Sequence, residues 1–194
     1  VLSWPRLERS GDHPAQLNVS ATYQGRRLPR TERSSARLTA YGPGAIDWGA
    51  GVAQAAAYVT ARDSVVGGLA RAAVRAIAPA DIIRFGSRNL AFAAALFDCL
   101  GQLRITYVPD PNNPFSTISE APKAVDTVQY PGETLRRLTG DCDDTSVLMA
   151  ALLASVGINT QFVDAPGHLF ILLDTGIDAR NRIGLSLDSA RTVV

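Results

Sequence analysis

The chain has 194 residues, of which 46% are hydrophobic and 19% are charged, and its formal net charge at pH 7 is +1. This length suffices for one or two domains with a sizeable core. A net charge so close to zero gives no electrostatic reason to expect nucleic acid or an anionic membrane as a partner. No apolar run free of glycine and charge reaches the ~18–20 residues that a bilayer requires, so we expect no membrane insertion.

The N-terminal part of the chain has the pattern of a small antiparallel β unit. Apolar and polar residues alternate over 17–23, which is the period of a half-buried strand. Gln24-Gly25 predicts a turn, and a second alternation follows over 36–40. We therefore expect an N-terminal β unit over residues 1–62.

Two helices, the first of them amphipathic, are predicted next, at the start of a second domain over residues 63–194. Apolar spacing predicts the first helix over 64–78, with Asp63 as its N-cap and Pro79 as its stop. The second helix is predicted over 87–100 and is apolar on almost every face.

The C-terminal part predicts a long loop, a buried helix and several strands. Prolines exclude a helix after Tyr107, and the loop runs to about Thr127. The segment after Gly140 is apolar all round, which is typical of a central helix, and Gly157 is a natural end for it. Strands are predicted over 161–163, 168–173 and 183–187.

The most informative motif is Gly140-Asp141-Cys142-Asp143-Asp144, with Pro166-Gly167-His168 following the buried helix. A thiol at a helix N-terminus beside an imidazole is the arrangement that produces a nucleophilic thiolate. Cys142 and His168 are therefore a candidate catalytic pair. The other cysteine, Cys99, lies within an apolar helix and is interpreted as a small buried hydrophobe. Two cysteines in such different contexts do not form a disulfide framework.

Over about Tyr130 to Thr175, this order of motifs resembles the bacterial transglutaminase-like superfamily of papain-type cysteine enzymes. The resemblance implies an α+β fold with a transglutaminase-like, papain-like core, in which helices pack on an antiparallel sheet. It also implies a Cys-His-Asp triad, with Cys142 as nucleophile and His168 as base.

The resemblance makes Asp188 the best-placed candidate for the acid of the triad. The match departs from the family in two ways near these residues. Leu169 and Phe170 follow the histidine, where many members carry a tryptophan, and Ser189 follows Asp188, where a proline is common. The alternative is an acid beyond Val194 in a longer parent protein, of which this chain would be a part truncated at its C-terminus.

The carboxylates around Cys142 have two interpretations. Acids in the first turn of a helix cap free N–H groups and interact favourably with its dipole, which is a structural role. The alternative is a cation site for calcium formed by Asp141 and Asp143, as in some periplasmic proteases of the superfamily. Otherwise we expect no cofactor. Gln129 and Tyr130 are further candidates for oxyanion or groove residues.

The chemistry implied by the resemblance is acyl transfer on the amide or peptide bonds of a protein or peptide substrate. Water as second nucleophile gives a peptidase or amidase, which we favour, and an amine gives a cross-linking transglutaminase. A catalytically silent member that serves as a binding or assembly module is the alternative, and the chain could belong to a larger assembly. The sequence does not distinguish a cytoplasmic from a periplasmic location.

Overall fold

The computed structural model describes residues 11–19, 22–27, 32–109, 125–178 and 180. The protein is of mixed α+β class and divides into two compact units, Val1–Ile46 and Asp47–Val194. Residues 47–62, which the sequence analysis grouped with the N-terminal β unit, belong to the second unit.

The first unit consists of antiparallel strand pairs. β1 (Gly11–Val19) pairs with β4 (Glu32–Ala40), in a register that runs from Gly11 opposite Ala40 to Val19 opposite Glu32. β2 (Thr22–Tyr23) pairs with β3 (Arg26–Arg27). The predicted turn between them is confirmed, with Gln24 at φ 46° and Gly25 at φ 76°. Two successive residues in the left-handed region are what a tight hairpin turn requires. β5 (Ala45–Asp47) follows.

The second unit begins with two 3₁₀ helices, η1 (Trp48–Ala50) and η2 (Val52–Tyr58). α1 (Ser64–Arg75) starts at the predicted cap, where Asp63 Oδ1 accepts from the N–H of Val65 at 2.8 Å. The helix ends earlier than predicted, and Pro79 opens α2 (Pro79–Phe85) instead of stopping α1. A proline at the first position of a helix costs no hydrogen bond, because a backbone N–H at this position would have no partner within the helix.

α3 (Arg88–Gln102) follows, capped by Ser87, whose Oγ accepts from the N–H of Leu90 at 3.0 Å. The short strand β6 (Thr106–Tyr107) pairs in parallel with β8 (Thr139–Gly140). Between them lie β7 (Val125–Thr127) and α4 (Pro131–Arg137), which the sequence analysis did not predict.

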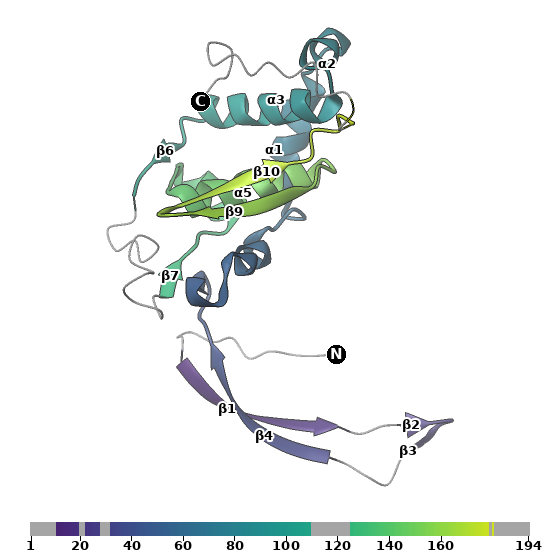
Figure 1. The fold of residues 1–194 in the computed structure, drawn as a ribbon, viewed down its shortest axis with the longest axis vertical. Coiled ribbons are helices and arrows are strands. Elements are labelled where there is room, and N and C mark those ends of the chain that lie inside the picture. The colour runs from purple at the N-terminus through teal and green to yellow at the C-terminus, as the bar shows by residue number, and fades with distance from the viewer. Residues whose placement is uncertain (1–10, 20–21, 28–31, 110–124, 179, 181–194) are drawn as a thin grey trace. The chain divides into compact units, whose positions relative to one another are not determined.

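α5 (Cys142–Ser155) is the central helix of the second unit, as its sequence predicts. Helices α1 and α3 and the hairpin of β9 (Thr160–Ala165) and β10 (His168–Leu173) pack against it (Figure 1). Each fully buried leucine in this core contributes about 1.5–3 kcal/mol. The fully buried core side chains include Val66, Ala70, Leu96, Leu148, Leu152 and Leu153.

The antiparallel hairpin confirms two of the predicted strands and positions His168 at the start of β10. His168 lies opposite Ala165 and Leu173 lies opposite Thr160, with Gly167 at φ 72° in the tight turn between the strands. Ile171 and Leu173 pack against the core. Among the helices in the described part of the chain, none is both long and apolar enough to span a bilayer.

Candidate active site

Cys142 is the first residue of α5, and Asp141 is its N-cap. The sequence favours a helix start here because the Asp141 side chain accepts from the N–H of Asp144, at 3.4 Å, in place of an intrahelical partner. This position directs the free N–H groups of the first turn toward the region of the thiol. The Cys142 side chain is almost completely buried, with 4% of its surface exposed.

The first turn of α5 lies along one edge of β10. The backbone N–H of Leu169 donates a hydrogen bond to the Cys142 sulfur, and the Leu169 carbonyl accepts from Ser146 Oγ at 3.0 Å. Cys142 and Ser146 are one helical turn apart, and the N–H and C=O of one strand residue point to the same side of a strand. A single residue of β10 is therefore held by two successive turns of the helix.

His168 immediately precedes this contact, so the fold brings Cys142 to the strand position next to the predicted base. Side chains alternate along a strand, and the Leu169 side chain is buried while those of His168 and Phe170 are exposed. The His168 and Phe170 rings stack with their centroids 6.4 Å apart. A direct contact between the imidazole and the sulfur stays a prediction. Asp188, the predicted acid, lies outside the described residues, as does the strand predicted over 183–187.

The electrostatic surroundings of Cys142 favour the neutral thiol. Burial raises its pKa, and the negative charge of Asp141 raises it further, whereas the N–H groups of Leu169 and Asp143 act in the opposite direction. One ligand atom from each of Asp141, Cys142 and Asp143 lies within 4.8 Å of the others. A thiolate would be favoured if these two carboxyls pointed away from the sulfur. In this structure they do not.

The three acids around Cys142 are all buried, and Asp141 and Asp143 are held by local hydrogen bonds. The capping role predicted for Asp141 is confirmed. Asp143 accepts from the N–H of Asp144 at 2.8 Å and shares a hydrogen bond with the Asp141 side chain. Burial first, and then the bond to Asp141 and the neighbouring charges, raise the pKa of Asp143 to about 10. Asp143 therefore carries a proton at neutral pH.

Asp141 and Asp143 supply the oxygen atoms that a hard cation such as calcium prefers, but the thiol between them suits softer metals. A cation would also have to displace the proton that Asp143 holds at neutral pH. Both carboxyls already serve the first turn of the helix. Their arrangement is explained by capping, and the acids alone do not define a metal site.

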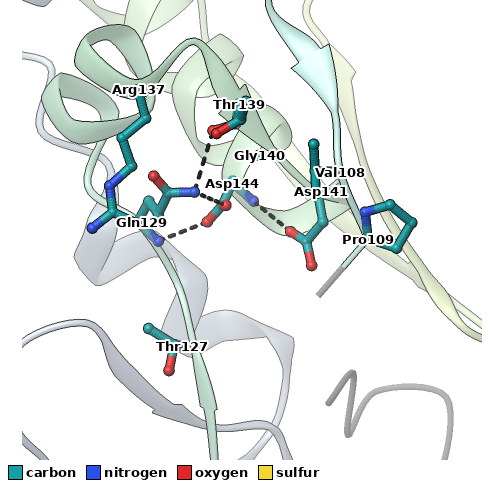
Figure 2. A pocket seen from close by; sticks show the side chains of 9 residues that line it. All are labelled: Val108, Pro109, Thr127, Gln129, Arg137, Thr139, Gly140, Asp141 and Asp144. Carbon is teal, nitrogen blue, oxygen red and sulfur yellow. Dashed lines mark hydrogen bonds between the residues drawn. The ribbon is translucent and has the colours of Figure 1, made fainter. Parts of the chain in front are cut away.

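Asp144 anchors the segment that precedes α4 rather than the thiol. Its carboxylate accepts from the backbone N–H of Gln129 at 2.7 Å and from Gln129 Nε2, which also donates to the carbonyl of Thr139 at 3.3 Å (Figure 2). Both N–H groups of the Gln129 amide are thus engaged, so this side chain does not serve as an oxyanion donor in the observed structure. Tyr130, the other candidate, packs its ring on Tyr58 with the centroids 5.2 Å apart.

A pocket of about 200 Å³ lies beside this network. Figure 2 shows its walls, in which Asp141 and Asp144 line one part and Val108, Gln129, Thr139 and Arg137 line others. Polar and charged groups from α4, β8 and the segment around β7 therefore converge next to the N-terminus of α5, beside the apolar Val108 and Pro109.

Tyr107 is the functional candidate that the sequence analysis missed. Its hydroxyl shares a hydrogen bond with the Cys142 sulfur, although the two residues are far apart in the chain. In the parallel pair of β6 and β8, Tyr107 lies opposite Gly140, two residues before the cysteine. No local sequence pattern marks this tyrosine, because only the pairing of two-residue strands brings it to the thiol.

Comparison with known proteins gives no match to a family model, to a curated protein or to a solved structure. The transglutaminase-like resemblance therefore stays a prediction from the motifs of this sequence.

Proposed function

We propose that the protein is a transglutaminase-like cysteine enzyme that acts on amide or peptide bonds by acyl transfer, as a peptidase or amidase. The observation that carries this proposal is the position of Cys142 at the start of a central helix. Its sulfur accepts a hydrogen bond from the backbone N–H of Leu169, the strand residue that follows His168. A thiol, a helix N-terminus and a histidine on one sheet edge are the parts that nucleophilic acyl transfer requires.

In the proposed reaction, the Cys142 thiolate attacks the amide carbon and forms an S–C bond. The carbonyl oxygen becomes an oxyanion, which the backbone N–H of Cys142 stabilises. Protonated His168 gives its proton to the leaving amine as the C–N bond breaks. Water then attacks the thioester and releases the acid, whereas an amine would give a transamidated product.

Burial opposes the first step, because it raises the pKa of the Cys142 thiol. His168 offsets this effect if it takes the thiol proton, since the imidazolium then stabilises the thiolate. The histidine side chain is exposed and therefore stays in contact with water. The proposal therefore requires that the reactivity of Cys142 depend on His168.

The proposed function can be tested with a general acyl donor, which does not require the natural substrate to be known. Native protein would be treated with p-nitrophenyl acetate, and acetylated peptides would be identified by mass spectrometry. We expect Cys142 to be acetylated before Cys99, although Cys99 is the more exposed of the two. The variant His168→Ala should lose this reactivity, whereas His13→Ala, in the other unit, should retain it. Preferential acetylation of Cys99, or equal reactivity in His168→Ala, would refute the enzyme proposal.

A catalytically silent binding or assembly module is the second candidate, and one observation favours it. Burial and the carboxylate of Asp141 act together to keep the thiol neutral. Without an imidazolium to counter them, Cys142 would be an unreactive part of the core. Absence of acetylation at Cys142 in the folded wild-type protein, with normal labelling after unfolding, is the result that this alternative predicts.

A further inference from the structure

The Tyr107 hydroxyl shares a hydrogen bond with the Cys142 thiol. The reaction proposed above gives this hydroxyl no role. The Tyr107 side chain is 53% exposed, whereas Cys142 is almost completely buried. A half-exposed side chain that reaches a buried sulfur separates that sulfur from solvent. Any carbonyl group that approaches Cys142 from this side must therefore come close to the phenol.

The backbone holds Tyr107 in place from both sides. The N–H of Thr106 donates to the carbonyl of Leu138 at 2.9 Å, and the N–H of Val108 donates to the carbonyl of Gly140 at 3.0 Å. The strand that receives these bonds continues directly into Asp141 and Cys142. The hydroxyl and the sulfur are thus positioned by the same short ladder, which is the preorganisation that electrostatic catalysis requires.

The phenol is suited to donate rather than to accept. Burial, the Cys142 thiol and the carboxyls of Asp141 and Asp143 all raise the pKa of Tyr107, so its O–H stays protonated at neutral pH. When the sulfur attacks a carbonyl, the negative charge moves to an oxygen that is two covalent bonds away. A donor that already reaches the sulfur needs only a small rotation to reach that oxygen.

We propose that Tyr107 is a further catalytic residue, whose hydroxyl donates a hydrogen bond to the Cys142 sulfur and then to the oxyanion of the tetrahedral intermediate. No proton is transferred from the phenol in this role, and the proton for the leaving group still comes from His168. This inference rests on the proposed function, since it assigns a second oxyanion donor to the same acyl-transfer step.

Two reagents separate the oxyanion role from any effect on the thiol itself. Iodoacetamide alkylates a thiolate by displacement of iodide and forms no oxyanion, whereas p-nitrophenyl acetate acylates it through a tetrahedral intermediate. The rates of both reactions at Cys142 would be measured in the wild type, in Tyr107→Phe and in the control Tyr23→Phe, which lies in the other unit. The ratio of the two rates cancels changes in access and in thiolate fraction.

Loss of one oxyanion donor typically costs about 10²–10³ in rate. For this activated ester we expect Tyr107→Phe to lower the ratio of acylation to alkylation by at least about tenfold, with Tyr23→Phe unchanged. Thermal unfolding of Tyr107→Phe should match the wild type, because the ring is retained at a half-exposed position. An unchanged ratio, or faster acylation, would overturn the role of Tyr107 and leave the proposed function standing. Failure of the wild type to be acylated at Cys142 would overturn both.

Discussion

Replacing Asp143 with asparagine should remove a pH dependence of stability that this buried carboxyl imposes on the second unit. Asp143 is 3% exposed, and its pKa is raised from 3.8 to about 10. Its place in the first turn of α5 favours the charged form by only about 0.3–1 kcal/mol, whereas burial of an unpaired ion costs several kcal/mol. Burial therefore prevails, and the folded protein holds a proton that the unfolded chain releases.

The direction in which stability changes with pH follows from this difference in bound protons. Between the two pKa values the folded state binds one more proton, so the free energy of unfolding falls as the pH rises. The slope is at most about 1.4 kcal/mol per pH unit, which amounts to about 3 kcal/mol between pH ~6 and pH ~8. An asparagine side chain reproduces the protonated carboxyl, because its oxygen can accept from the N–H of Asp144 and its amide can donate to Asp141.

Urea denaturation at several pH values would measure the effect in the wild type and in Asp143→Asn. We expect the stability of the wild type to fall from pH ~6 to pH ~8, and the variant to be nearly level and more stable at the higher pH. The difference between the two curves isolates Asp143 from Asp144, whose pKa burial also raises. Parallel curves, or a wild type that gains stability as the pH rises, would refute the assignment of a neutral Asp143.

Three further substitutions test how the fold holds the site. Gly140→Ala should lower the free energy of unfolding by about 1–3 kcal/mol, because an added Cβ would lie 2.7 Å from the Cβ of Asp144; a variant as stable as the wild type would disprove this close packing. Ser146→Ala should cost about 1 kcal/mol and slow acylation of the thiol, since it removes the bond that fixes Leu169 beside the sulfur. Unchanged stability and reactivity would show that this bond does not position the strand. Asp63→Ala should cost about 1 kcal/mol through loss of the cap of α1, with Asp63→Asn nearly neutral and acylation unaffected in both; equal losses in the two variants would contradict a capping role.

The sequence by itself determined the elements that depend on neighbouring residues. The caps at Asp63 and Asp141 and the turn at Gln24-Gly25 are local, because each forms within a few residues of the same segment. The apolar run of α5 likewise predicted its burial, since a helix that is apolar on every face has no surface suited to water. The proline rule was insufficient at Pro79, because a proline that stops one helix is equally suited to begin the next.

The chemistry around Cys142 was decided by tertiary structure. Tyr107 reaches the sulfur only through the pairing of β6 with β8. Asp144 accepts a hydrogen bond from the N–H of Gln129, and no local sequence pattern predicts this contact. The raised pKa values of Cys142 and Asp143 come first from burial, which depends on everything packed around them. Helix capping and periodicity are short-range properties of a chain, whereas desolvation and contacts between distant strands exist only once the chain has folded.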